Sequence, residues 1–404
     1  MIPSKHRATM AQQERGGERF LLGINYWPRT TAMAMWTRFD IGEIDEDFSR
    51  IAAFGLHAVR FFLLWEAFQP APREINGATL DHFEKVLECA RRHGLLTMPT
   101  LFCGHMSGVN WLPSWTLDEH RPHGRFRTIA GRTESSYGAG DTYEGPLLDA
   151  QRAFVRVIGG RAKDHPSVLA WDLGNEFSNV REPSSVHAAH VWSATLADEL
   201  LESSGIAVTA GTHGEDLTED RNIRLSSLCE PFSFATMHGY PVYSAFARRP
   251  DDPEVVPFLG ALAGGFSARR LFFTEFGNPT CSRDTEATSM GCLDEDAMAE
   301  YATAVLHRLQ ERGALGAFWW CWADYAAELK ATPPFDRSPH ELHFGIVRND
   351  GTEKPVANAL ARFAGEKHEV IAASDRAADD ETRYYAGLPH STEDAFRRYL
   401  EAHG

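Results

Sequence analysis

The chain of 404 residues is long enough for one large α/β barrel or for two or three smaller domains. Hydrophobic residues make up 43% of it and charged residues 24%, a composition that is typical of globular proteins and excludes global disorder. The 40 Lys and Arg against 56 Asp and Glu give a net charge of −16, which argues against nucleic acid and anionic membrane as partners because both attract basic surfaces.

Targeting signals and cysteines bear on the location of the protein. The first 19 residues are polar and lack the apolar stretch of a secretion signal. No run approaches the roughly 18 apolar residues that a membrane span needs. The six cysteines form no Cys-x-x-Cys pair, so neither a zinc site nor a redox dithiol is indicated. We therefore expect a cytoplasmic protein with reduced thiols.

Short apolar runs alternate with amphipathic stretches along most of the chain. We expect the apolar runs to be strands, and they lie at 20–25, 57–64, 95–102, 168–173, 206–211, 232–239, 270–277 and 313–320. Between 80 and 94, by contrast, apolar residues recur at intervals of three and four, which predicts one face of a helix. Gly94 and Gly205 each follow such a stretch, at the place where a helix often ends in a left-handed residue.

Eight strand-and-helix units predict an α/β fold, a (β/α)8 TIM barrel. The competing arrangement is a doubly wound sheet that binds a nucleotide, and the chain has neither of the glycine-rich phosphate-binding motifs of that class. We expect a polar N-terminal segment at 1–19 and a catalytic barrel at 20–364. We expect residues 365–404 to form a C-terminal helical extension that packs on the barrel or on a neighbouring subunit.

Long loops, inserted at 104–146 and 321–344, follow the third and eighth expected strands. Barrel enzymes build their sites at this end of the strands, and long loops there are often functional. Both inserts are rich in ring side chains, which are His105, Trp111, Trp115, His120, His123, Tyr137 and Tyr143 in the first and Trp322, Tyr325 and Phe335 in the second. We expect both inserts to fold over the mouth of the barrel and to close one end of a cleft.

Carboxylates lie at the ends of two expected strands. Asn175 and Glu176 end the fourth strand, and Glu275 ends the seventh. Two carboxyl groups that face each other across a cleft can hydrolyse a glycosidic bond, since one protonates the leaving oxygen while the other attacks the anomeric carbon. Among 56 acidic residues two could reach strand ends by chance, but both follow apolar runs and so do not belong to a charged surface.

These motifs resemble those of clan A glycoside hydrolases, and most of all glycoside hydrolase family 5, over roughly residues 20–364. In that family the fourth strand ends in Asn-Glu, with Glu as the acid/base, and the seventh ends in the nucleophilic Glu. These positions match Asn175, Glu176 and Glu275. Four other family motifs, on or just after strands 2, 3, 6 and 8, match Arg60, His105, the pair His238 and Tyr240, and Trp320.

The resemblance implies a role for each charged or amide group. Arg60 would keep Glu275 ionised, and Asn175 would donate to the 2-hydroxyl of the sugar. Glu176 would protonate the leaving group and then act as the base that activates water. Tyr240 would hold Glu275 in the attacking geometry. The plain alternatives are a structural arginine and an asparagine that only caps a turn.

The remaining matches would shape the sugar site. His105 and His238 would line it, and Trp320 would form the floor on which a pyranose stacks. Trp322 points to the same side of an extended strand and is the alternative to Trp320. Each of these rings could instead be an ordinary core residue.

Other reaction classes have less support in the sequence. No His-Glu-x-x-His or His-x-His motif occurs, so we expect no metal site and no cofactor. A serine nucleophile would need a Gly-x-Ser-x-Gly motif, and an aldolase would need a lysine at a strand end. A non-catalytic carbohydrate-binding barrel remains the alternative of a different class.

We therefore expect a retaining β-glycosidase that acts on an oligosaccharide substrate. Of the family-5-like enzymes, exo-acting β-mannosidases are the most similar, because the inserts would leave a pocket and the missing secretion signal suits short imported sugars. An endo-acting β-1,4-mannanase or β-glucanase is the alternative, with the inserts then serving as subunit contacts in a homo-oligomer. Neither the sugar nor the oligomeric state follows from the sequence.

Overall fold

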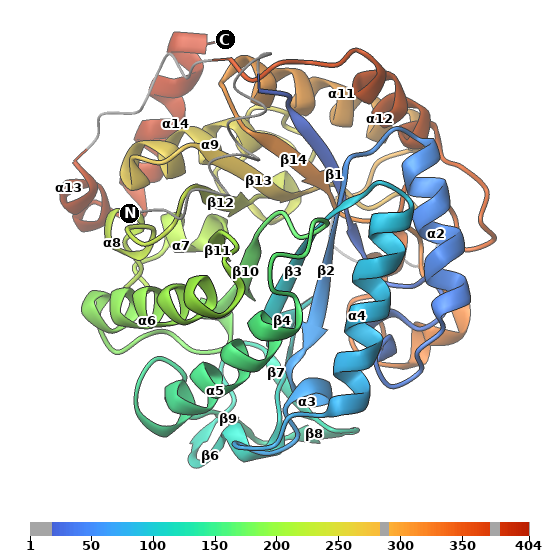
Figure 1. Ribbon diagram of the computed structural model, residues 1–404. Coiled ribbons are helices and arrows are strands. Elements are labelled where there is room, and N and C mark those ends of the chain that lie inside the picture. Colours follow the sequence, from blue (N-terminus) through green and yellow to red (C-terminus); the bar gives the residue numbers. More distant parts are fainter. Residues whose placement is uncertain (1–17, 283–290, 372–379, 404) are drawn as a thin grey trace.

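Eight parallel strands form the centre of the molecule in the computed structural model, which describes residues 18–282, 291–371 and 380–403 (Figure 1). Hydrogen bonds connect them in the order β11-β10-β3-β2-β1-β14-β13-β12. Their bounds are β1 Leu21–Tyr26, β2 Ala58–Leu64, β3 Leu96–Cys103, β10 Trp171–Asn175, β11 Val208–Gly211, β12 Ala235–His238, β13 Leu271–Phe276 and β14 Gly316–Trp319. A parallel bridge between His213 and His238 joins the two outer strands of this order. The predicted (β/α)8 barrel is therefore confirmed.

Helices surround the sheet and connect its strands (Figure 1). The longer ones are α2 Ile41–Ala53, α4 Gly77–Arg92, α5 Gly145–Arg161, α6 Val186–Ser204, α9 Val255–Ser267, α11 Glu295–Glu311 and α12 Pro355–Gly365. The shorter ones are α3 Trp65–Phe68, α7 Gly214–Thr218 and α8 Leu225–Leu228. Helix α2 begins where the Asp40 side chain accepts hydrogen bonds from two backbone N–H groups, and α6 ends at Gly205 in the left-handed region. None of the described helices has the length and apolar character to cross a membrane.

The interior of the barrel changes from apolar to polar along each strand. Side chains in a strand alternate between two faces, so residues two apart point the same way. Ala58, Met98 and Ala170 belong to an apolar cluster inside the barrel. Two positions further along the same three strands lie three hydrogen-bonded polar residues, Arg60, Thr100 and Asp172. Polar side chains therefore lie toward the carboxyl ends of these strands, and the apolar cluster fills the barrel below them.

The first insert, after β3, forms short strands: β4 His105–Met106, β5 Val109–Trp111, β6 Leu117–Pro122, β7 Arg127–Ala130, β8 Thr133–Ser135 and β9 Tyr137–Ala139. The second, after β14, contains the 3-10 helices η5 Ala327–Ala331 and η6 Pro339–His343. The inserts bind each other, because Arg127 pairs with Asp336 and Arg337 pairs with Glu134. The first insert of the barrel thus contacts the second across the loop end of the sheet.

Most ring side chains of the inserts are buried, and several pack against residues of the barrel. Trp115 packs edge-on against Trp65, and Tyr143 lies against Phe177. Of the ten ring residues that the sequence analysis named, only His105 lines the cavity described below. The inserts shape the cavity mainly with other residues, because their larger rings are needed to fill the space between the short strands and the barrel.

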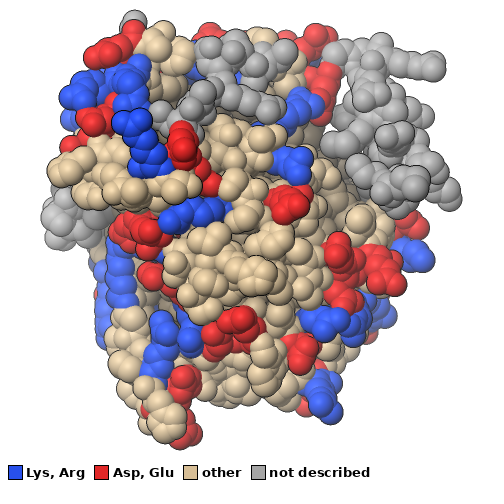
Figure 2. All heavy atoms as spheres, turned by 90° about the vertical axis from the view of Figure 1, so that its left-hand side faces the viewer, with Lys and Arg blue, Asp and Glu red and all other residues tan. Residues whose placement is uncertain are grey.

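The C-terminal extension contains α13 Glu381–Ala386 and α14 His390–His403. It packs on α9 and the loop before it: the Phe396 ring contacts the rings of Phe246 and Phe258, with centroids 5.1 and 4.9 Å away. Basic and acidic side chains are mixed over the face of the molecule seen in Figure 2, which is the left-hand side of Figure 1 where α13 lies. Residues 1–17 of the expected N-terminal segment lie outside the described residues.

One pair of cysteines differs from the prediction. Cys281 and Cys292 form a disulfide, whereas the described thiols of the other four cysteines are free and buried. The prediction of six reduced thiols is therefore wrong for this pair. The sequence places the two 11 positions apart, and only the folded segments on either side of residues 283–290 bring their sulfur atoms together.

Candidate active site

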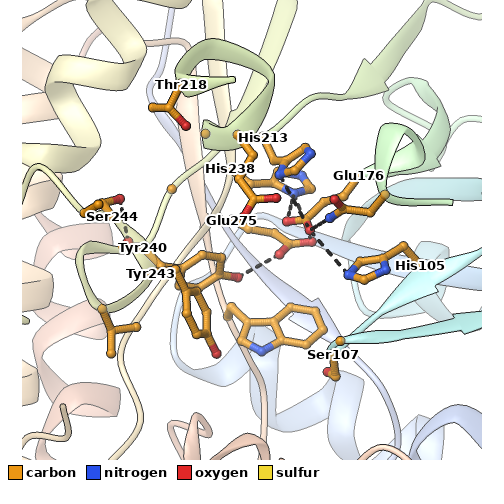
Figure 3. Close-up of a pocket in the computed structure, with 18 of the residues that line it drawn as sticks. His105, Ser107, Glu176, His213, Thr218, His238, Tyr240, Tyr243, Ser244 and Glu275 are labelled. Carbon is orange, nitrogen blue, oxygen red and sulfur yellow. Dashed lines mark hydrogen bonds and ion pairs between the residues drawn. The ribbon is translucent and has the colours of Figure 1, made fainter. Parts of the chain in front are cut away.

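The carboxyl ends of the strands surround a cavity of about 800 Å³ (Figure 3). Seven of the eight predicted site residues line it, namely His105, Asn175, Glu176, His238, Tyr240, Glu275 and Trp320. The eighth, Arg60, is fully buried and contacts the side chains of Asn175 and Glu275. The structure therefore brings all eight predicted residues together.

Arg60 connects four strands at the base of the cavity. Its Nη1 donates to Glu275 Oε1 and to Asn25 Oδ1, the latter at 3.0 Å. Its Nε and Nη2 donate to Asp172 Oδ2 at 2.9 and 2.7 Å. Burial alone would lower the pKa of Arg60, but Asp172 and Glu275 outweigh it and raise the pKa. The arginine is thus a fixed positive charge beside Glu275.

Gly211 has no side chain and therefore leaves room for the Arg60 guanidinium. A side chain at Gly211, the last residue of β11, would begin 3.1 Å from Nη2 of Arg60 and 2.4 Å from the carbonyl oxygen of Gly174. Any larger residue at 211 would push Arg60 away or separate β10 from β11.

Glu275 reaches the cavity because β13 is irregular. Phe272 points into the barrel interior, so strict alternation would send Thr274 inward and Glu275 outward. The pairing register of β13 with both neighbouring strands shifts near this point, as in a β-bulge, which can re-aim a side chain. The Tyr240 hydroxyl donates to Glu275 Oε2 at 2.7 Å (Figure 3). Desolvation and the Glu275 charge hold the pKa of Tyr240 well above its ordinary value, so the phenol keeps its proton.

Glu176 lies just past the end of β10 in a strained conformation. Its φ of 47° is in the left-handed region, which non-glycine residues rarely adopt and which often marks a functional position. Asn179 Nδ2 lies 3.1 Å from Glu176 Oε2, and His238 Nδ1 lies 3.2 Å from Oε1. About a sixth of its side chain is exposed, against 5% for Glu275. The more exposed carboxylate is thus the one that solvent and a leaving group can reach.

Three imidazoles face Glu176 (Figure 3): His105 from β4, His238 from β12 and His213 from the segment after β11. Besides the contact with His238, His105 Nε2 and His213 Nδ1 each lie 3.9 Å from Glu176 Oε2. Burial lowers the pKa of His105 and lowers that of His238 to about 3, so both rings are neutral at neutral pH. Asn110 Oδ1 lies 2.8 Å from His105 Nδ1, which assigns the proton of the neutral ring to that nitrogen.

The two carboxylates lie close together. One oxygen of Glu176, one of Glu275 and a nitrogen of His238 are all within 4.8 Å of one another. Such a group can in principle hold a cation. The guanidinium of Arg60 pairs with Glu275 and would repel a cation placed beside that carboxylate. These residues therefore suit a reaction that uses two carboxyl groups better than they suit a metal site.

Trp320, and not Trp322, lines the cavity. The strand β14 ends at Trp319, and the next ring along the chain forms part of the cavity wall. Trp322 lies 1% exposed in the core, where it packs against Phe54 and under Arg50. The structure thus places Trp320 in the cavity wall and Trp322 in the core, because the extended geometry that would put both on the same side ends at residue 319.

Several cavity residues were missed by the sequence reasoning. Asn25 and Asp172 hold Arg60 from strands β1 and β10. Strand position could have identified both, since each lies where its strand turns polar. His213, Tyr243 and Glu341 lie in connecting segments without regular periodicity. Only the folded structure shows that these three reach the cavity.

Comparisons with known proteins support the fold. No protein-family model matches the chain, and no curated protein matches it. Among solved structures it is similar to the exo-beta-1,4-mannosidase Op5Man5 from Opitutaceae bacterium strain TAV5, with a TM-score of 0.73 and 24% identity over 88% of this chain. The aligned part is 60% of Op5Man5, so the chain spans about three-fifths of that protein.

Two further similar structures are GH5_18 proteins. One is from Streptomyces cattleya in complex with GlcNAc, with a TM-score of 0.75 and 20% identity over 89% of this chain and 83% of that one. The other is from Bifidobacterium longum subsp. longum in complex with Manb1-4GlcNAc, with a TM-score of 0.72 and 20% identity over 88% of this chain and 80% of that one. At these identities the likeness shows a shared barrel fold. The family in these names is the one that the sequence motifs resemble.

Proposed function

We propose that the protein is a retaining β-glycosidase of the family 5 type. The observation that supports this best is the pair Glu176 and Glu275, whose nearest oxygens are at most 4.8 Å apart in a cavity large enough for a sugar. Retaining glycosidases hold their carboxyl groups about 5–5.5 Å apart, whereas inverting enzymes need a wider gap for a water molecule. The short separation therefore favours direct attack by one carboxylate.

Glu275 is the nucleophile in this proposal. Arg60 and Tyr240 each donate to one of its two oxygens, which fixes the direction of the carboxylate. Its attack on the anomeric carbon forms a glycosyl-enzyme ester while the bond to the leaving oxygen breaks. Asn175 has its carbonyl oxygen bound by Arg60 and donates one amide hydrogen to the backbone oxygen of His105, so a second amide hydrogen is available for the 2-hydroxyl of the sugar.

Glu176 is the acid and then the base. It transfers its proton to the leaving oxygen in the first step and takes a proton from water in the second, when that water attacks the ester and releases the sugar. Neutral His105 presents an unprotonated Nε2 toward Glu176 Oε2, 3.9 Å away. Asn179 and His238 hold the carboxyl group in place.

An exo-acting mode is supported by the connections between the walls of the cavity. The first insert binds the second through Arg127 and Asp336, and it binds the segment after β11 through Arg125 and Glu215 at 2.7 Å. Ion pairs between these loops favour a pocket that is closed at one end. An open groove for a polymer would need a gap through this wall.

A β-mannosyl oligosaccharide is the substrate that we propose, because the similar structures include proteins named for mannosidase activity or bound to a mannosyl disaccharide. A panel of p-nitrophenyl β-glycosides with manno, gluco and galacto configuration tests the activity and the sugar. We expect fastest release from the mannoside. A manno-oligosaccharide ladder tests the mode, since an exo enzyme releases mannose from the start whereas mid-length products indicate an endo enzyme. No turnover of any aryl glycoside would favour a non-catalytic carbohydrate-binding barrel.

A further inference from the structure

Glu341, in the insert after β14, has an unusual environment in the cavity wall. Its side chain is 9% exposed. The Tyr243 hydroxyl donates to its Oε1 at 2.9 Å, and the Ser107 hydroxyl donates to its Oε2 at 3.0 Å. Tyr243 follows β12 and Ser107 follows β3. One carboxylate therefore connects three separate segments of the cavity wall.

No Lys or Arg in the described part of the chain pairs with this buried carboxylate. Buried acidic groups are normally paired with Lys or Arg. Among the described residues, neither lies within ion-pair distance of Glu341, and its nearest basic neighbour is His340, whose Nε2 is 3.6 Å away. That same nitrogen contacts the Tyr243 hydroxyl at 2.9 Å. A carboxylate offers about four acceptor positions, and the two hydroxyls leave acceptor capacity that a ligand in the cavity can use.

Glu341 lies on the side of the cavity where the retained sugar belongs. Tyr243, which binds it, packs against Tyr240 with ring centroids 5.5 Å apart, and Tyr240 binds Glu275. In Figure 3, Tyr243 and Ser107 lie on the opposite side of Glu275 from His213. Trp320 and Glu341 line the same cavity as Glu275. A sugar bonded to Glu275 and stacked on Trp320 would extend toward Glu341, with the leaving group on the side of Glu176 and His213.

We propose that Glu341 accepts a hydrogen bond from the 4-hydroxyl at the non-reducing end of the retained sugar and so restricts cleavage to terminal units. This proposal rests on the proposed glycosidase function. In a β-1,4 chain that continues past this sugar, the 4-hydroxyl is replaced by an ether oxygen, which has no hydrogen to donate. The buried carboxylate would then lose its partner and face a second acceptor, which is costly in a site of low exposure.

A substrate series tests this contact directly. The wild-type protein and Glu341→Gln are assayed with the aryl β-glycoside that the wild type hydrolyses fastest and with its 4-deoxy analogue. We expect the wild type to prefer the 4-hydroxy substrate by about 100-fold in kcat/KM, because a site built to bind a hydroxyl rejects the analogue that lacks it. In Glu341→Gln we expect this preference to fall to about 10-fold or less, while turnover of the 4-deoxy analogue changes little.

Glu328→Gln is the matched control, since Glu328 is an exposed glutamate of the same insert and does not line the cavity. It should keep the wild-type preference. An unchanged preference in Glu341→Gln would overturn the role of Glu341 and leave the glycosidase proposal intact. If that variant does not fold, equal wild-type rates on the two substrates would overturn it as well. Failure of the wild type on every aryl β-glycoside would instead overturn the proposed function.

Discussion

At the scale of single residues, the site assigns different tasks to two similar carboxyl groups through their neighbours. Glu275 is nearly buried and has a guanidinium and a phenol on its oxygens. Glu176 is more exposed and has an amide and three imidazoles around it, of which two have lowered pKa values because they are buried. A fixed positive charge thus lies on the carboxylate of Glu275, while the carboxyl group of Glu176 lies where solvent can reach it.

Glu275→Ala should reduce turnover by at least about 1,000-fold, because no other carboxylate can attack the anomeric carbon. Azide at high concentration should restore part of the rate and give an α-glycosyl azide, since the smaller side chain leaves space for an external anion. Product analysis by NMR measures the configuration. A Glu275→Ala protein with wild-type turnover would refute the assignment of the nucleophile.

Glu176→Ala should affect substrates according to their leaving groups. Dinitrophenyl glycosides need no proton to depart, so we expect glycosylation with them to be spared relative to natural oligosaccharides. Azide should then give a β-glycosyl azide, because the intermediate on Glu275 still forms. Steady-state rates on the two substrate types provide the measurement, and an equal loss on both would show that Glu176 is not the acid.

At the scale of the elements, the periodic pattern of apolar residues predicted the barrel strands but not the irregular features, such as bulges and contacts between loops. All eight strands were located from apolar runs, to within a few residues at their ends, because a buried parallel strand needs such a run. The positions of Glu176 and Glu275 followed from strand ends, and that of Arg60 from the motif of the family that the sequence resembles. The β-bulge that turns Glu275 inward left no trace in the sequence, and neither did the contact of Glu341 with Tyr243. Such contacts depend on loop conformations that no periodic pattern encodes.

The C-terminal helix α14 is attached to the barrel by aromatic packing, and this gives a test of its contribution. Phe396 is 4% exposed and packs against the rings of Phe246 and Phe258. Phe396→Ala should lower the free energy of unfolding by about 3 kcal/mol, because it removes buried apolar surface and leaves a cavity. Chemical denaturation measures the change. Arg397→Ala, at an exposed position next to it, is the control and should cost less than about 0.5 kcal/mol.

At the scale of the whole molecule, buried titratable groups make stability depend on pH in opposing ways. Burial lowers the pKa of His57 to about 4 and that of His238 to about 3. Burial raises the pKa of Asp47 and of Asp324 to about 6. Acidification from pH 6.5 toward 4 therefore weakens the fold through the two histidines, which must gain protons on unfolding, and strengthens it through the two aspartates.

One variant isolates the contribution of His57 to this pH dependence of stability. His57 Nδ1 accepts a hydrogen bond from the backbone N–H of Leu22 at 3.0 Å, and a glutamine at this position can accept the same bond without titrating. His57→Gln should remove a stability loss of at most about 3 kcal/mol that the wild type shows as the pH falls from 6.5 to 4. Unfolding free energies of both proteins at several pH values test this. Parallel pH curves would show that His57 does not titrate on unfolding.

The cytoplasmic location remains a prediction at this scale. Disulfides persist mainly in oxidising compartments. Whether Cys281 and Cys292 form a disulfide in the native protein therefore bears on its location. Thiol labelling of the protein in its own cells, before lysis, measures this redox state.

The cavity wall also includes Pro389, Thr392 and Glu393, which belong to the C-terminal extension. Both proposed catalytic glutamates and all eight barrel strands precede these residues in the chain. During synthesis the ribosome therefore completes the barrel before it makes this part of the wall. A nascent chain held short of α14 lacks this part of the wall, and the cavity gains it only when the last helix docks.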